Sequence, residues 1–171
     1  SREKIEICLD PTFLYEFNFI DTFQIPNFPY ILVYTYGMID DRVKEVQDYA
    51  RRHDLKLISA GFRHMWCDYQ LACTPFDFLT LVKNAVAVIT DTFHGSVFAI
   101  KYNKDFVVYN KQKPKVHYLL EDLGLVSALA ETGYLSSIDK IRSDFVGVNQ
   151  LLLAKIASSR LYLEECIAQI K

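Results

Sequence analysis

The chain has 171 residues, a formal net charge of −2, 51% hydrophobic residues and 23% charged residues. This length and composition are typical of one globular domain with a substantial core, and they exclude a disordered chain. The slight negative charge argues against a nucleic-acid partner, which would require a basic stripe, and no apolar run reaches the roughly 18 residues of a transmembrane helix.

The four cysteines form no C-x-x-C pair and are interpreted as free thiols of a cytosolic protein. His64, Cys67 and Cys73 could together bind a metal, but their spacing is not that of a zinc site, so neither a metal nor a cofactor is predicted. The expected location is cytoplasmic, with peripheral association with the inner face of the membrane as an option. Because the chain opens without an initiator Met, we expect it to be a fragment of a longer protein.

The first predicted element is a short strand over residues 5–9, ended by the breaker Asp10-Pro11. Residues 12–29 are rich in aromatic side chains without a clean period, which predicts a connector packed against another surface, such as a missing domain. Residues 30–36 form a continuous run of β-branched, aromatic and other apolar residues, which is typical of a strand buried on both faces.

A helix follows over 40–53, with acidic residues at its start and basic residues at its end. A strand is predicted over 55–60 and a polar, aromatic loop over 62–72. Thr74, followed by Pro and by an acid three residues on, predicts the N-cap of a helix that runs to about residue 84.

The second half of the chain continues the alternation of strands and helices. It predicts a strand over 86–90, a helix over 93–102, a strand over 106–109 and a helix over 116–123. One or two helices over 144–170 complete the chain.

This alternation predicts the α/β class, a doubly wound parallel sheet of the Rossmann type. We expect a single domain over 1–171, in which 1–29 form the first strand and connector, 30–143 the βα core and 144–171 the C-terminal helices. In such a fold, ligands bind outside the carboxyl ends of the strands.

The densest group of polar residues lies where the strand at 86–90 turns into the helix at 93–102. The helix start supplies free backbone N–H groups and a partial positive charge, both suited to a phosphate or carboxylate. His94 can transfer a proton near neutral pH, and Gly95 would let an anion approach the backbone. A structural interpretation is open too, with Asp91 or Thr92 as a cap. The candidate residues of this group are Thr90, Asp91, Thr92, His94, Gly95 and Ser96.

Four further residues are candidates for binding. Tyr36 and Gly37 occupy an equivalent strand end, where the alternative is ordinary turn chemistry. Trp66 could stack on a sugar or could cover the core. A lysine-rich loop such as the one around Lys115 is usually solvated, but its position after the strand that ends at Tyr109 would let Lys115 contact an anion.

The segment Thr90-Asp91-Thr92-Phe93-His94-Gly95-Ser96-Val97-Phe98, followed by Tyr102-Asn103-Lys104-Asp105-Phe106, resembles the signature of polysaccharide pyruvyl transferases. Thr74-Pro75-Phe76-Asp77-Phe78-Leu79, residues 120–125 and Asp10-Pro11-Thr12-Phe13-Leu14 strengthen the resemblance, which spans most of the chain. Members of that family have two Rossmann-like halves arranged like a GT-B glycosyltransferase. This chain resembles the C-terminal half, so an N-terminal domain of the same protein is an expected partner.

The resemblance implies a donor, phosphoenolpyruvate, and a saccharide acceptor on a cell-surface polysaccharide that receives a pyruvyl ketal. It implies that His94 protonates the enol methylene carbon, that Asp91 orients or tunes His94, and that the helix start with Ser96 holds the anionic groups of the donor.

Two positions depart from the family pattern. Thr92 and Lys115 stand where many members carry Arg, and Lys lacks the bidentate fork of Arg. Two alternatives therefore stay open: a GT-B glycosyltransferase that uses a nucleotide-sugar, and a non-catalytic sugar-binding module.

Overall fold

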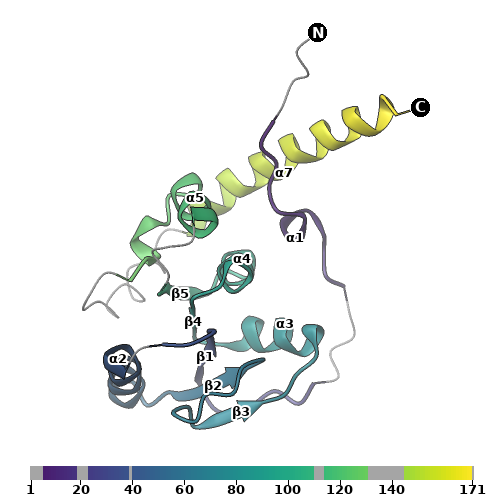
Figure 1. The fold of residues 1–171 in the computed structure, drawn as a ribbon. Helices are drawn as coiled ribbons and strands as arrows, with labels where there is room; N and C mark the ends of the chain where they lie inside the picture. The colour runs from purple at the N-terminus through teal and green to yellow at the C-terminus, as the bar shows by residue number, and fades with distance from the viewer. Residues whose placement is uncertain (1–5, 19–22, 39, 110–113, 131–144, 171) are drawn as a thin grey trace.

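The computed structural model describes residues 6–18, 23–38, 40–109, 114–130 and 145–170 (Figure 1). Its centre is a five-stranded sheet in the order β3-β2-β1-β4-β5, and every neighbouring pair is parallel. The strands are β1 (Tyr30–Tyr34), β2 (Lys56–Ala60), β3 (Tyr69–Leu71), β4 (Ala87–Thr90) and β5 (Asp105–Val108). The predicted α/β fold with a doubly wound parallel sheet is confirmed.

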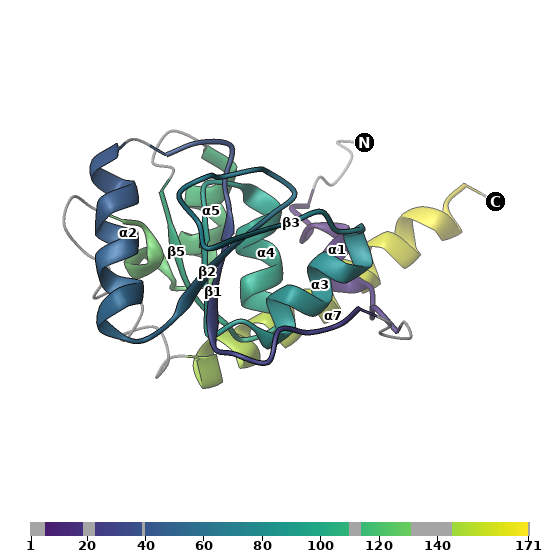
Figure 2. The same cartoon turned by 90° about the horizontal axis from the view of Figure 1, so that it is seen from below.

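Helices cover both faces of the sheet. Helix α2 (Asp40–Arg52) covers one face, and α3 (Pro75–Asn84) and α4 (Phe93–Lys101) lie on the other, as Figure 2 shows. The second face also carries the shorter helices α1 (Pro11–Leu14) and α5 (Pro114–Asp122), the 3-10 turn η1 (Val126–Ala128) and the long C-terminal helix α7 (Phe145–Ala168). None of the helices in the described part of the chain has the length and apolarity that crossing a bilayer requires.

The strands are apolar at consecutive positions because both faces of the sheet are buried. In β1, Ile31 and Val33 pack under α2, whereas Tyr30 and Leu32 belong to the larger core under α3, α4 and α5. All four side chains are essentially inaccessible to solvent. An uninterrupted apolar run is what a two-sided parallel sheet requires, and it made these strands predictable.

The strand predicted at residues 5–9 is wrong over its described part, since residues 6–10 have no regular secondary structure. The Leu9 N–H donates to the Ser159 hydroxyl at 3.1 Å, and Asp10 caps helix α1 through the N–H of Thr12. The N–H groups of Leu9 and Thr12 are thus satisfied by side chains instead of by a neighbouring strand.

The connector expected to face another domain packs largely on this chain itself. Phe13 is buried in the larger core, and Phe17, Phe23 and Phe28 are half-buried against it. Tyr15 stays exposed, and residues 19–22 lie outside the described part.

Two further predictions need adjustment. The loop predicted at 62–72 contains the short edge strand β3, which pairs with β2. The C-terminal segment, for which one or two helices were open, forms one described helix, α7.

Candidate active site

The polar segment after β4 lies where the strand order of the sheet reverses. Strand β1 has β2 on one side and β4 on the other, and Tyr34 is in register with Thr90 at the carboxyl ends. This junction is the place where open α/β sheets bind ligands. It brings together the two strand ends that carry Tyr36 and Gly37 on one side and Asp91 on the other.

The Asp91 carboxylate connects these two strand ends. It accepts hydrogen bonds from the Tyr36 N–H, at 2.9 and 3.1 Å to its two oxygens, and from the Gly37 N–H at 3.5 Å. Asp91 is 93% buried while Tyr36 is largely exposed, so a buried carboxylate fixes the backbone of an exposed loop. Its predicted influence on His94 remains a prediction.

A compact hydroxyl network then starts helix α4. The Thr90 hydroxyl donates to the Tyr34 carbonyl at 2.7 Å and lies 2.9 Å from the Thr92 hydroxyl. The Thr92 hydroxyl caps the helix by accepting from the Gly95 N–H at 2.9 Å. The structural interpretation of Thr92 as a cap is therefore confirmed, and neither threonine has much exposed surface.

Gly95 is required for close packing of α4 against this network. A Cβ atom at this position would lie 2.2 Å from the Thr90 hydroxyl oxygen and 2.8 Å from that of Thr92. The hydroxyls of Thr90 and Thr92 occupy the space that a side chain at this position would need. The sequence had instead led us to expect that this space lets an anion approach the backbone.

Ser96 is fully buried, and its hydroxyl donates to the Thr92 carbonyl at 3.0 Å. This is the bond that a serine in a helix commonly makes to the carbonyl four residues earlier. In this conformation Ser96 stabilises the first turn of α4 and presents no surface to a ligand. Direct contact of Ser96 with a donor remains a prediction.

His94 is the exposed reactive group of the segment. Its side chain is 57% exposed, and its Nε2 lies 3.9 Å from Oδ2 of Asp10. The ring lies near Phe93 and Phe98, with ring centres 5.4 and 6.4 Å away. A solvent-accessible imidazole beside a carboxylate at a helix N-terminus can transfer a proton to a bound molecule.

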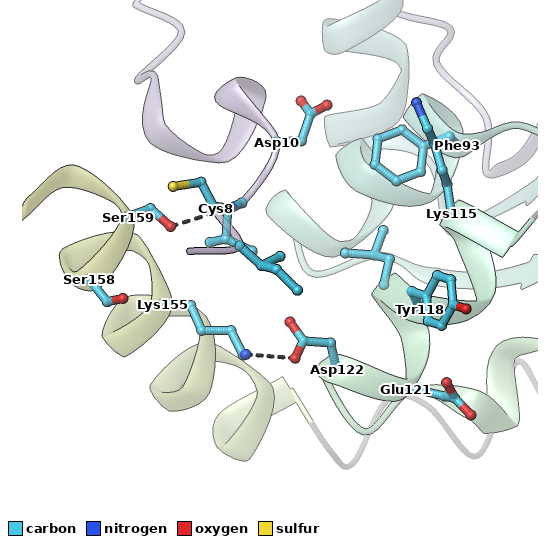
Figure 3. A pocket seen from close by; sticks show the side chains of 13 residues that line it. Cys8, Asp10, Phe93, Lys115, Tyr118, Glu121, Asp122, Lys155, Ser158 and Ser159 are labelled. Atoms are coloured by element: carbon cyan, nitrogen blue, oxygen red, sulfur yellow. Dashed lines mark hydrogen bonds and ion pairs between the residues drawn. The ribbon is translucent and has the colours of Figure 1, made fainter. Parts of the chain in front are cut away.

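A cavity of about 880 Å³ lies beside this pair (Figure 3). Asp10, Phe93 and Lys115 line one end of it, and an ion pair between Lys155 and Asp122, at 2.7 Å, lies at the other. Ile7, Leu9 and Leu119 make much of its wall apolar. His94 is not among the lining residues, so the cavity reaches this pair through Asp10 and through Phe93, the neighbour of His94 in the chain.

Sequence reasoning missed Asp10 as a site residue. The available signal was its place in the segment Asp10-Pro11-Thr12-Phe13-Leu14, which carries part of the family resemblance. Asp122, which also lines the cavity, lies in the segment 120–125 that shares in the resemblance. Tyr118 and Lys155 gave no such signal, because they lie on helices whose approach depends on tertiary packing.

Trp66 lies apart from the other predicted residues. It is half-buried and lines a smaller cavity of about 230 Å³ together with Gln47, Asp54 and Lys56, where β2 begins. This is the opposite end of the sheet from the α4 segment. Trp66 packs against the core beneath α2, in line with the core-covering alternative.

The residues weighed as soft metal ligands have other partners. His64 Nε2 lies 3.0 Å from the hydroxyl and 2.9 Å from the carbonyl of Thr35. Burial, with a smaller effect of Asp68, raises the pKa of the Cys67 thiol to about 12. Among the described residues no group of three His, Cys, Asp or Glu side chains is placed to hold a metal ion. All four cysteines are free thiols.

The architecture matches that of GT-B glycosyltransferases. The crystal structure of the glycosyltransferase SnogD from Streptomyces nogalater superposes with a TM-score of 0.50 at 15% sequence identity. The match covers 85% of this chain and 43% of SnogD, so the chain spans less than half of that protein's length. At this identity the similarity defines the fold, a Rossmann-like unit of the GT-B type.

The family follows from the sequence. The family model described as polysaccharide pyruvyl transferase matches residues 1–111, which include Asp10 and the whole segment around His94. The chain belongs to the polysaccharide pyruvyl transferase family. No curated protein sequence matches it significantly.

Proposed function

We propose that this chain is one half of an enzyme that transfers a pyruvyl group from phosphoenolpyruvate to the hydroxyls of a saccharide in a cell-surface polysaccharide. The observation that carries the proposal is the exposed His94 at the start of α4, 3.9 Å from Asp10, which lines a cavity together with Lys115. Family membership over residues 1–111 gives this arrangement its chemical context.

In the proposed reaction, the His94 imidazolium donates a proton to the methylene carbon of phosphoenolpyruvate. The adjacent carbon becomes electron-deficient, and the oxygen of one acceptor hydroxyl bonds to it. The C–O bond to phosphate then breaks, and inorganic phosphate leaves. A second hydroxyl then bonds to the same carbon and closes the ketal. Of the two hydroxyl protons, one restores the His94 imidazolium and the other leaves with phosphate.

The donor carries a carboxylate and a phosphate, and two features could hold them. Lys115 contributes a point charge to the cavity that Asp10 and Phe93 also line. The α4 N-terminus contributes its partial positive charge in the same region. Lys115 in place of the Arg of many relatives would favour charge neutralisation over bidentate recognition.

The remaining predicted site residues would act by shaping this region. In this proposal Thr90, Thr92 and Gly95 set the position of the α4 N-terminus through their hydroxyl network and close packing. Asp91 fixes the loop that presents Tyr36. Tyr36 and Gly37 would then contact substrate from the neighbouring strand end.

Acceptor contacts would come in part from an N-terminal half of the same protein. The match to only 43% of SnogD supports this expectation. The two Rossmann-like halves that the resemblance implies agree with it. We expect the 171-residue chain alone to fold but not to turn over phosphoenolpyruvate. Turnover by the chain alone at the rate of the two-domain protein would contradict this.

The similarity to a glycosyltransferase favours a second candidate, an enzyme that uses a nucleotide-sugar. A calorimetric titration separates the two. The two-domain protein is titrated with phosphoenolpyruvate and with a panel of nucleotide-sugars, and a Lys115→Ala variant serves as control. Binding of phosphoenolpyruvate that weakens in the variant supports the proposal, whereas binding of a nucleotide-sugar alone would replace it. Binding of free saccharide without either donor would favour a non-catalytic module.

A further inference from the structure

The two oxygens of the Asp10 carboxylate have different surroundings. Oδ1 accepts hydrogen bonds from the Thr12 N–H, at 3.0 Å, and from the Thr12 hydroxyl, and so caps helix α1. Oδ2 is directed to His94, 3.9 Å from Nε2. A helix cap needs one oxygen, so the second is available for another role.

The position of Asp10 is fixed on both sides by the rest of the fold. The preceding residue, Leu9, donates its N–H to the Ser159 hydroxyl of α7 at 3.1 Å. On the other side Phe13 is 99% buried, and the Lys101 ammonium donates to the Tyr15 carbonyl at 2.8 Å. Lys101 is the last residue of α4, and His94 lies in the first turn of the same helix. This contact therefore connects the segment that carries Asp10 directly to α4.

His94 has few other partners. Phe93 and Phe98 lie near its ring, and Asp10 is the carboxylate within 4.0 Å of it in the described part of the chain. In an imidazole, the hydrogen bond made by one ring nitrogen determines whether the other ring nitrogen carries a proton.

We propose that Asp10 is the positioning residue for His94. The Asp10 carboxylate accepts a hydrogen bond from the Nε2–H of His94, so that Nδ1 carries the proton that is delivered to the donor. The inference rests on the proposed function. The separation of 3.9 Å closes to a hydrogen bond with a shift of about 1 Å, a tightening of the kind expected when a catalytic site binds its substrate.

The simpler alternative is that Asp10 only caps α1. Asn caps a helix about as well as Asp, because its side-chain oxygen can accept the same N–H. Asp10→Asn therefore preserves the cap and removes the negative charge facing His94. Asp48→Asn is a matched control, since Asp48 pairs with Arg51 on α2, on the other face of the sheet.

The test is a double-mutant cycle on kcat in the protein that includes its N-terminal half, with phosphoenolpyruvate as donor. We expect Asp10→Asn to lower kcat by on the order of 10–100-fold, the usual cost of losing an orienting partner, with KM for the donor changed less than about twofold. In a His94→Ala background the same change should have almost no further effect. Asp48→Asn should match the wild type.

A second readout does not depend on activity. The 15N shifts of the His94 ring at a pH where it is neutral should show the Nε2–H tautomer in the wild type and a changed tautomer balance in Asp10→Asn. Wild-type kcat in Asp10→Asn, or an equal loss in the His94→Ala background, would overturn the inference. If His94 is essential while Asp10→Asn is silent, this inference alone fails. If the wild type transfers no pyruvyl group, the proposed function fails with it.

Discussion

Replacement of Gly95 by Ala tests the packing that places His94. The new Cβ would lie 2.2 Å from the Thr90 hydroxyl oxygen, a distance that no real contact tolerates. That oxygen donates to the Tyr34 carbonyl and accepts from the Thr92 N–H, so moving it disturbs two hydrogen bonds as well as the cap of α4.

The magnitude follows from opposing contributions. Ala favours a helix over Gly by about 1 kcal/mol. Overpacking costs about 1–3 kcal/mol, and each weakened hydrogen bond costs about 1 kcal/mol. The net expectation is a loss of about 2–4 kcal/mol, or a decrease in Tm of roughly 4–16 °C for a domain of this size.

Gly147→Ala provides the control. Gly147 lies on α7, and a Cβ there would meet nothing within 4 Å, so helix propensity alone should raise stability by about 0.5–1 kcal/mol. Both variants are measured by urea unfolding followed by circular dichroism. Equal or greater stability of Gly95→Ala relative to the wild type would refute the packing argument.

Three further changes test other contacts. Lys115→Ala should weaken donor binding with little effect on kcat, and more at low than at high ionic strength; a salt-independent Kd, or the same loss in Lys44→Ala on the opposite face, would contradict this. Asp91→Ala leaves the N–H groups of Tyr36 and Gly37 without their carboxylate and should lower the free energy of unfolding in urea by about 1–3 kcal/mol, more than Asp91→Asn. A loss below about 0.5 kcal/mol would refute the role of Asp91 in fixing this loop. Because burial raises the pKa of Cys67 from 9.0 to about 12, the unfolded chain loses its proton first, so stability is full below pH 9 and falls between pH 9 and 12. Cys67→Ala should reduce the dependence of the unfolding free energy on pH in this range by about 1 kcal/mol per pH unit. An unchanged dependence would contradict the attribution of this loss to Cys67.

The strands of the sheet interior were predictable because their apolar runs have one physical cause, burial on both faces. The capping box of α3 was equally readable, since Thr74 and Asp77 exchange the two hydrogen bonds that define it. Strand β3 escaped prediction because it has three residues at an edge and its first residue, Tyr69, is exposed. A strand at 5–9 was predicted wrongly because a short apolar run cannot reveal that the Leu9 N–H bonds to a distant helix.

The candidate site likewise has features that the local sequence predicts and one feature that it does not. Local sequence placed His94 at a helix start, and the structure confirms that placement. The burial of Ser96 also had a local signal, because it stands one helical turn after Thr92 and can donate to its carbonyl. The pairing of Asp10 with His94 had none, since 84 positions separate them and only the packing of α1 on α4 brings them together.

The central claim is that His94 supplies the proton for pyruvyl transfer, and steady-state kinetics of His94→Ala in the two-domain protein tests it most directly. With phosphoenolpyruvate as donor, kcat should fall by on the order of 10²–10⁴-fold, while donor binding changes little. Circular dichroism should show an unchanged fold, because the side chain is largely exposed. A folded His94→Ala variant with wild-type kcat would remove His94 from the mechanism and leave a binding module as the better account.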